Sequence, residues 1–531
     1  MNKVGQNGQG LSRRGFLGRG AVASGAALAL TPAGAALARH RRNGPAGYGP
    51  LVEDPGGLID LPRGFRYRVV QSLDDRLLSG PAAGAAVPGD FDGMVALRGP
   101  GRHSVTLVRN HELSSGSDAA KAPVPAIRPY DPSEIGGTTA LVVGPNGRLQ
   151  DSYVTNSGTS TNCAGGGTPW GTWLTCEETR TAGHGFVFEV DPRYPGQRLS
   201  RKPIEAMGYF SHEAVDIDPR TGIAYLTEDD FRGSQVAPGE ERPDNPDDPR
   251  DAPNTPGDDV PDFTRSSFLY RYLPDNRAQR PGALQDGGRL QVMAIDEQPL
   301  FNMDLGETGQ RFRVVWKDVR AEEPHDDALR QGGARFQRLE GCHFAGGAFW
   351  FDDTSGGEKR HGQLFRLIPS GQLDGGGVDT LELFLEGESE EQMDSPDNLV
   401  ITPWGDLWFA EDGDGIQRVV GVTPDGRTYE FARNRLVGKD TPEDDASEFA
   451  GPTFSPSGRT FFLNIQDPGH TFAIWGPFPA RNAGGQRAMA NASARHRWAP
   501  KGSDASREYA VRHGVSPEEA AAFEALGVSL G

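Results

Sequence analysis

The sequence of 531 residues lacks three features that would indicate common classes of protein. After the first 30 residues, no apolar run reaches the length of about 18 residues that suggests a membrane-spanning helix. Its three cysteines, Cys163, Cys176 and Cys342, are too few and odd in number for a disulfide framework. Few segments show the 3.6-residue periodicity of amphipathic helices. We therefore expect no stable membrane insertion, no disulfide scaffold and no helical bundle.

Glycine and proline are abundant, with 72 and 41 residues, while only 36% of the chain is apolar. This composition is typical of many short strands joined by turns. A unit of strand, Pro-x-Gly or Pro-x-x-Gly turn and second strand recurs at residues 142–149, 216–226, 400–409 and 453–463. Repeated hairpins of this kind predict an all-β fold, most simply a β-propeller with loop insertions. A pair of β-sandwiches is the alternative.

The first 38 residues carry an export signature. Ser12-Arg13-Arg14-Gly15-Phe16-Leu17 is a twin-arginine motif, an apolar stretch follows to Leu30, and Ala36-Leu37-Ala38 is a small-residue cleavage site. We expect residues 1–38 to be a signal peptide read by the twin-arginine export machinery. The protein would then be secreted, or reside in the periplasm or cell envelope.

The rest of the chain divides by composition. Residues 39–60 are predicted to be a linker, and residues 61–480 to be the propeller, with an acidic, proline-rich insertion at 232–262. Residues 481–531 form a C-terminal extension. It contains the clearest helix signal of the sequence, a short helix that begins with Ser516 as N-cap.

The chain is acidic, with a formal charge of −19. The first 38 residues hold four basic residues and no acidic one, so the remainder carries −23. Such a surface repels nucleic acid, and we expect no nucleic-acid binding. An anionic substrate would need a locally positive site, which bound cations could supply.

Acidic residues recur where predicted inner strands begin and end. If these strands converge on a propeller axis, the carboxylates crowd into one funnel and require protons or metal ions. Oxygen donors in that number favour Ca²⁺, and the thiolate of Cys163 favours a softer metal such as iron or zinc. The candidate metal ligands are Glu112, Cys163, Glu177, Glu178, Glu213, Glu228, Asp229, Glu340, Asp397, Asn398, Glu411 and Asp412. His111 and His212 are expected to orient a neighbouring carboxylate, with ligation of iron as the alternative.

Several of these segments together resemble the signature of the PhoX family of exported alkaline phosphatases. The resemblance covers roughly residues 50–480 and is strongest from Asn162-Cys163-Ala164-Gly165-Gly166 to Cys176-Glu177-Glu178. It extends to the segments 212–216, 340–342, 395–398 and 448–451. It implies a six-bladed propeller that holds a cluster of Ca²⁺ and Fe³⁺, with Cys163 at the position that bridges two ferric ions.

On this basis we expect an exported, metal-dependent phosphatase, a monomer, that hydrolyses small-molecule phosphate monoesters in the propeller funnel. Cys163 is its central catalytic residue, and Arg109, Arg335 and Arg338 are candidates for holding phosphate or the leaving group. No serine or threonine nucleophile motif and no P-loop is present. Two alternatives stay open: another exported propeller hydrolase, such as a Ca²⁺-dependent lactonase, and a non-catalytic binding propeller.

Overall fold

The computed structural model describes residues 46–196, 198–230, 266–371, 377–436 and 446–479, and the backbone of 497–498. The predicted signal peptide, the insertion at 232–262 and the helix from Ser516 lie outside these residues. No described helix is long and apolar enough to cross a membrane.

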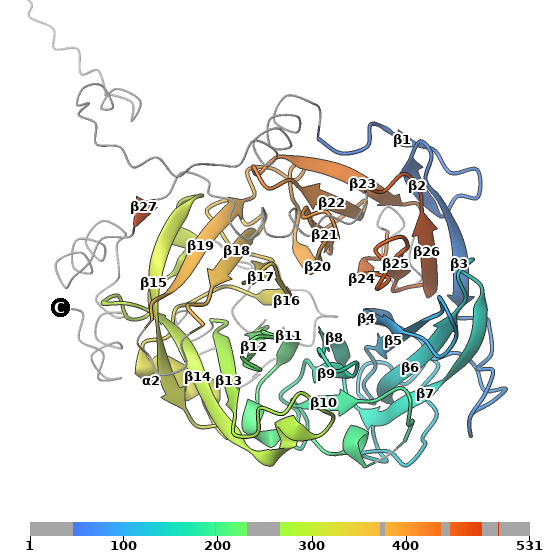
Figure 1. The fold of residues 1–531 in the computed structure, drawn as a ribbon, viewed down its shortest axis with the longest axis horizontal. Coiled ribbons are helices and arrows are strands. Elements are labelled where there is room, and N and C mark those ends of the chain that lie inside the picture. The colour runs from blue at the N-terminus through green and yellow to red at the C-terminus, as the bar shows by residue number, and fades with distance from the viewer. Residues whose placement is uncertain are drawn as a thin grey trace, which may run out of the picture. The chain divides into compact units, whose positions relative to one another are not determined.

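Six strands surround the centre of the ring in Figure 1, and each contacts the next one along the chain. The last of them also contacts the first, so that the ring is closed. These inner strands are β4 (Phe91–Arg98), β8 (Asn162–Gly167), β11 (His212–Ile217), β16 (Leu339–Ala345), β20 (Pro396–Ile401) and β24 (Phe449–Phe454). The fold is therefore a β-propeller, as the repeated hairpins predicted.

From each inner strand the chain runs outward through antiparallel neighbours. The first half of the ring has β5 (Val105–His111), β6 (Gly136–Val143), β7 (Leu149–Thr159), β9 (Trp173–Glu177), β10 (Val187–Val190), β12 (Ala224–Glu228), β13 (Leu269–Pro274), β14 (Gly288–Ile295) and β15 (Gln310–Val319). The second half has β17 (Ala348–Asp353), β18 (Gln363–Ile368), β19 (Asp379–Glu386), β21 (Leu407–Glu411), β22 (Arg418–Val422), β23 (Thr428–Asn434), β25 (Phe461–Ile465) and β26 (His470–Trp475).

Long-range pairings complete the ring. Strand β3 (Arg66–Ser72) pairs with β26, so an early strand closes the last blade. Strand β15 pairs with β19, which joins the β11–β15 and β16–β19 blades into one sheet. The short β27 (Arg497–Trp498) runs parallel to β15.

The predicted linker at 39–60 is wrong in its second half. Leu51–Val52 and Ile59–Pro62 are strands β1 and β2, and β2 pairs with β23. Ile59 and Leu61 are buried against the β20–β23 blade. The propeller therefore begins before residue 61.

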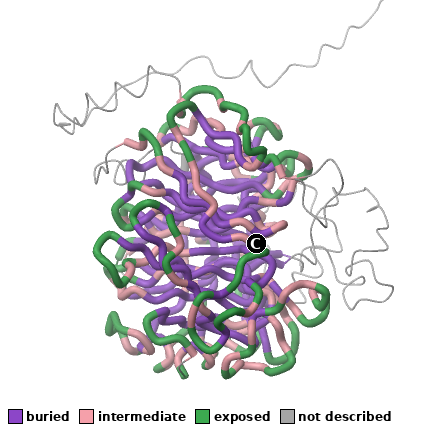
Figure 2. The backbone as a smooth tube through the Cα atoms, turned by 90° about the vertical axis from the view of Figure 1, so that its right-hand side faces the viewer, coloured by how far each residue is buried: buried purple, intermediate pink, exposed green. Residues whose placement is uncertain are grey.

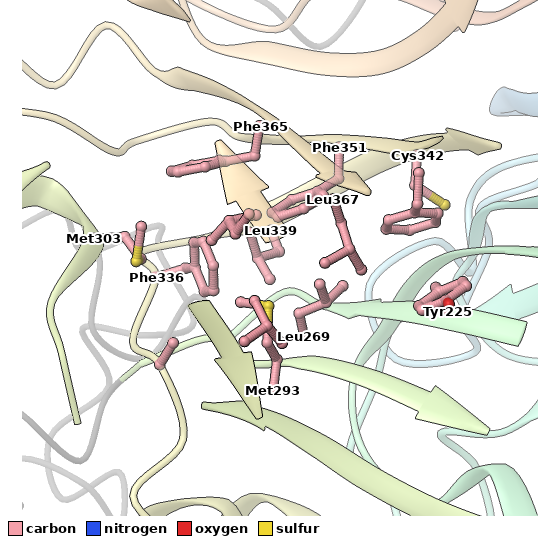
Figure 3. Packing of buried hydrophobic residues seen from close by; sticks show 14 of the residues in the cluster. Tyr225, Leu269, Met293, Met303, Phe336, Leu339, Cys342, Phe351, Phe365 and Leu367 are labelled. Carbon is pink, nitrogen blue, oxygen red and sulfur yellow. The ribbon is translucent and has the colours of Figure 1, made fainter. Parts of the chain in front are cut away.

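Apart from one α-helix, α2 (Pro324–Gln331), the described helices are 3-10 turns. These are Leu199–Arg201, Glu205–Met207, Ala283–Asp286 and Met303–Leu305. The core lies between neighbouring blades: Figure 3 shows Phe351 and Phe365 of one blade facing Leu269 and Met293 of the next. Most strand residues are buried, and Figure 2 shows buried backbone through the interior with exposed segments toward the outside.

Candidate metal centre

Every inner strand is interrupted at an equivalent place by an irregular step in its pairing with the second strand of the blade. A β-bulge bends a strand and redirects its side chains, and bulges are frequent beside active sites. The steps lie between Phe91 and Met94, Asn162 and Gly165, His212 and Val215, Leu339 and Cys342, Pro396 and Leu399, and Ala450 and Thr453. In five of the six bulges the first residue is an acid or a cysteine. We call these residues the bulge ring: Asp92, Cys163, Glu213, Glu340 and Asp397.

A small residue follows most members of the bulge ring, and it allows the inner strands to approach closely. A Cβ atom on Gly93 would lie 2.5 Å from the Cα atom of Ala164 in the next inner strand. A Cβ atom on Gly341 would lie 2.5 Å from the carbonyl oxygen of Asp397. Such distances are far below van der Waals contact. The absence of a side chain at these glycines therefore keeps the ring narrow.

The second strand of each blade ends opposite the start of the inner strand. His111 is paired with Phe91, Glu177 with Asn162, Glu228 with His212, and Glu411 with Pro396. The residue after each of these four strand ends is acidic. We call these acids the exit ring: Glu112, Glu178, Asp229 and Asp412.

Donor atoms of the two rings lie within reach of a common metal ion. The sulfur of Cys163 and carboxylate oxygens of Glu178 and Glu213 lie within 4.8 Å of one another. Oxygens of Glu213, Glu340 and Asp397 do the same. Glu213 belongs to both groups, so the two candidate sites are adjacent. One offers a thiol with two carboxylates, and the other offers carboxylates alone.

The proximity of these acids disturbs their ionisation. Burial and the nearby Asp90, Asp118, Asp397 and Asp412 raise the pKa of Glu112 to about 8. The pKa of Asp397 is raised to about 7, mainly by burial and then by Asp412. Burial combined with repulsion from other acids also raises the pKa values of Asp92, Glu178, Glu213 and Glu340 well above the ordinary range. Without a cation, the rings are an unfavourable place for so much negative charge.

Cys163 is held at the junction of two inner strands. Its thiol is 3.4 Å from the carbonyl oxygen of His212 and 3.5 Å from that of Glu213, to which it donates weak hydrogen bonds. Burial, followed by the charges of Glu213 and Glu178, raises the pKa of the thiol. Metal binding through this sulfur would therefore have to displace its proton.

One predicted basic residue lies at the rings. The Nε atom of Arg338 is 3.0 Å from Oδ1 of Asp229, and its Nη2 atom is 2.9 Å from Oε1 of Glu340. Arg338 thus connects the exit ring to the bulge ring. Among the described residues, it is the only lysine or arginine that forms an ion pair with either ring.

The other two arginines are placed differently from the prediction. Arg109 is fully buried inside a blade, where its guanidinium donates to Thr471 and Gln71 and lies 3.5 Å from the centre of the Phe91 ring. It is a core residue and has no access to a substrate. Arg335 donates from Nε to the Ser266 hydroxyl at 3.1 Å, and no described ion pair connects it to either ring.

Three predicted metal ligands instead hold the loops that lead into the inner strands. Glu177 accepts hydrogen bonds from the Ser160 and Gly185 amides and from His184, at 2.7 to 2.9 Å. Successive side chains of a strand point to opposite faces, so the last residue of each second strand points away from the residue after it. We call these residues the clamp acids: Glu177, Glu228 and Glu411.

The other two clamp acids are bound in the same way. Glu228 accepts from Arg180 at 2.6 Å and from the Phe268 amide at 3.2 Å. Glu411 accepts from Arg418 at 2.6 Å and from the Asp394 amide at 3.0 Å. These contacts give the clamp acids a structural role, and the prediction that they bind metal stays a prediction. Glu228 also lies in a third acidic group with Asp230 and His325, but Arg180 already provides a cation there.

Asn398 and the two histidines support the site without facing it. Asn398 donates to Oδ1 of Asp397 at 2.8 Å and accepts from the Gly451 amide at 2.7 Å, so it orients a ring carboxylate. His111 is bound between the Gly89 carbonyl and the Thr139 hydroxyl. His212 binds the Gly208 carbonyl. The expectation that these histidines orient carboxylates is wrong.

The candidate metal ligands from the sequence did not include three acids near the centre. Asp92 occupies the first bulge, and the pair Asp92-Gly93 is equivalent to Glu340-Gly341, which was a usable signal. Glu448 precedes β24, and its pKa is raised by burial and by Asp412 and Asp397. Asp352 is fully buried, and neither of its carboxylate oxygens has a hydrogen-bond partner. Its neighbours include Asp397 and Glu340.

The inner strands continue past the bulge ring and surround a cavity of about 310 Å³. Its lining includes Met94, Val95, Ala164 and Leu399, and Asp216 is its only carboxylate. This cavity lacks the donor atoms of the rings. The chemistry of the site therefore belongs to the rings and not to this cavity.

Comparisons with known proteins identify a family for this chain. The profile of the family described as alkaline phosphatase PhoX matches residues 46–152, 144–236 and 247–469. Among solved structures, the holo form of the PQQ domain of pyranose dehydrogenase from Coprinopsis cinerea is similar over 80% of this chain and 98% of that one, with 10% identity and a TM-score of 0.33. This likeness is too weak to support an argument. No curated protein sequence gives a significant match.

Proposed function

Because the chain belongs to the PhoX family of alkaline phosphatases, we propose that this phosphatase hydrolyses phosphate monoesters at a Ca²⁺ and Fe³⁺ centre held by the bulge and exit rings. The observation that carries the proposal is the position of Cys163. Its thiol lies within 4.8 Å of carboxylate oxygens from Glu178 and Glu213. A buried thiol among carboxylates has no evident use in a scaffold, whereas a thiolate can bridge metal ions.

The donor atoms present fit the proposed ions. Cys163, Glu178 and Glu213 combine sulfur and oxygen, which suits iron, while Glu213, Glu340 and Asp397 offer the oxygen ligands that Ca²⁺ prefers. The raised pKa values of Glu112 and Asp397 support this assignment, because cations would relieve the repulsion that causes them. The unpartnered oxygens of Asp352 point to the same need for positive charge.

When bound, the ions would supply Lewis-acid chemistry and positive charge at the phosphate. The chain itself contributes the orientation of that phosphate. Arg338 offers a planar set of N–H donors that matches two phosphate oxygens. Asn398 fixes the carboxylate of Asp397 through its amide group. The exposed Asp412 marks the side of the rings that solvent reaches.

Export remains part of the proposal. The twin-arginine motif and the cleavage site favour a protein that is transported after folding and that acts in a secreted, periplasmic or envelope location. The family membership favours the phosphatase over the lactonase and the non-catalytic propeller considered from the sequence.

The test combines elemental analysis with substrate comparison. Native protein should contain both calcium and iron, and it should hydrolyse p-nitrophenyl phosphate faster than bis-p-nitrophenyl phosphate. Protein that contains calcium without iron, and remains fully active, would contradict the role of Cys163. Faster cleavage of the diester would contradict the assignment to monoesters.

A further inference from the structure

Arg338 forms ion pairs with two carboxylates that would also bind metal ions in the proposed centre. Its guanidinium binds Asp229 of the exit ring and Glu340 of the bulge ring, with N–O distances of 3.0 and 2.9 Å. Glu340 belongs to the group of three carboxylates whose oxygens lie within 4.8 Å of one another. The Arg338 side chain is only 19% exposed, so these ion pairs are poorly screened by water. The guanidinium and a divalent cation would therefore interact with the same oxygen atoms.

The surroundings make this single positive charge important. The rings contain eight carboxylates, those of Asp92, Glu112, Glu178, Glu213, Asp229, Glu340, Asp397 and Asp412. Two other arginines form ion pairs with acids outside the rings. Arg180 pairs with Glu228, and Arg418 pairs with Glu411, which are both clamp acids. Within the described part of the chain, Arg338 is thus the cation that offsets part of the ring charge.

We propose that Arg338 acts as a stand-in cation. It stabilises Asp229 and Glu340 while the chain folds, competes with metal ions for them, and is released by metal binding so that it can hold the substrate phosphate. This inference rests on the proposed function, because it assigns the same arginine two successive partners. The metal-loading step requires no covalent change, only the replacement of one cation by another at these carboxylates.

The competition has a predictable sign. Two like charges a few Å apart repel strongly even at an effective dielectric constant of about 20. Removal of the guanidinium charge should therefore tighten Ca²⁺ binding by more than about tenfold. The same change leaves Asp229 and Glu340 without a counter-charge and should lower the melting temperature of the metal-free protein. Opposite effects on metal affinity and on metal-free stability distinguish competition from simple support of the ligands.

The experiment is calorimetric titration of CaCl₂ into chelator-treated full-length protein, together with thermal unfolding before and after titration. Arg338→Gln removes the charge, and Arg338→Lys keeps it without the planar donor set. The matched control is Arg418→Gln, which breaks an arginine–carboxylate pair at a clamp acid. We expect tighter Ca²⁺ binding in Arg338→Gln, affinity within about threefold of the native protein in Arg338→Lys because the charge is kept, and no tightening in Arg418→Gln.

The outcomes separate this inference from the proposed function. Native protein that binds no Ca²⁺ would contradict the proposed metal centre. Native protein that binds Ca²⁺, with equal or weaker binding in Arg338→Gln, would overturn the stand-in role. If Arg338→Gln does not fold without metal, the crystal structure of the Ca²⁺-loaded native protein decides. A guanidinium more than about 4 Å from Asp229 supports the inference, and an intact ion pair overturns it.

Discussion

Glu177 and Glu178 show how two adjacent acids of the same type acquire different tasks. Glu177 is the last residue of β9, and its carboxylate accepts hydrogen bonds from the Ser160 and Gly185 amides at 2.9 Å. Glu178 is the next residue, and its carboxylate lies with Cys163 and Glu213. The alternation of side chains along an extended chain is sufficient to explain the difference. The clamp acids and the exit ring therefore differ in the direction of their side chains and not in residue type.

This pair supports the first prediction, which compares Glu177→Gln with Glu178→Gln. Glu177→Gln places an NH₂ group opposite backbone N–H donors, so the free energy of unfolding should fall by about 1–3 kcal/mol. Glu178→Gln removes a repelled charge, so the metal-free protein should become more stable, while metal affinity falls by more than about tenfold. Thermal unfolding and metal titration of both variants check this. Similar effects of the two substitutions would contradict the division of roles.

Cys163 gives the second prediction. Cys163→Ser should lose iron and phosphatase activity while the fold is kept, because a serine hydroxyl is far less often ionised than a thiol and is a harder donor. Cys176→Ala is the matched control, since Cys176 is a fully buried core residue. It should retain iron and cost about 1–2 kcal/mol of stability. Folded Cys163→Ser protein with full activity and native iron content would exclude the bridging role.

Among the structural elements, the bulged inner strand is the repeated unit that builds the site. Each bulge redirects the side chain of one residue, and the second strand of the blade ends beside that bulge. A blade therefore supplies one residue to the bulge ring and one to the exit ring, provided that the residues at these two places have suitable donor atoms. Four blades do so, with Asp92 and Glu112, Cys163 and Glu178, Glu213 and Asp229, and Asp397 and Asp412. The β16 blade supplies Glu340 and then Thr354. The β24 blade has Gly451 and Gln466 at these two places.

The third prediction concerns the narrowness that the small residues allow. Gly341→Ala would place a methyl group 2.5 Å from the carbonyl oxygen of Asp397, so the β16 and β20 strands would have to separate. We expect a loss of stability of about 1–3 kcal/mol and weaker metal binding. Gly116→Ala is the control, because its nearest neighbour would be 3.9 Å away and the residue is exposed. Metal titration of both variants is the measurement. Native-like metal affinity of Gly341→Ala would show that the spacing of strands β16 and β20 is not critical for metal binding.

The parts of this site that the sequence revealed are the local ones. The Pro-x-Gly hairpins predicted the propeller, and acids after hydrophobic strands predicted Glu178, Asp229 and Asp412. The bulges were not visible, because a register shift depends on the pairing of two strands and not on one segment. The period-two alternation was visible and would have separated Glu177 from Glu178. Closure of the ring by β3 was also beyond local reasoning, since it pairs Ser72 with His470.

At the scale of the whole molecule, the dominant feature is its negative charge. The chain without its first 38 residues carries −23, and a concentration of that charge is buried in the rings. Folding around such a centre is costly unless protons, Arg338 or metal ions offset the charge. The protein must therefore be most sensitive to metal removal under conditions where the ring acids lose their protons.

This gives the fourth prediction, the pH dependence of the metal-free protein. The native pKa values of Glu112 and Asp397, about 8 and 7, lie above their ordinary values, so the native state binds more protons than the unfolded state. Stability must then decrease as pH rises through these values. The buried His212 and His343, whose pKa values are lowered to about 4, act in the opposite direction only below about pH 6.5. Melting temperatures of chelated protein should fall between about pH 6.5 and 8.5, and a flat or rising profile would contradict the crowding of the rings.

The central claim is that bound cations turn an acidic funnel into a site for a phosphate anion. Its most direct test is calorimetric titration of inorganic phosphate into metal-loaded and metal-stripped protein. We expect phosphate to bind the loaded form and not the stripped form, since uncompensated carboxylates repel it. Added salt should weaken binding only modestly, because the decisive charges lie within the screening length of about 8 Å at 0.15 M. Equal binding by both forms would show that phosphate is bound elsewhere and would contradict the account.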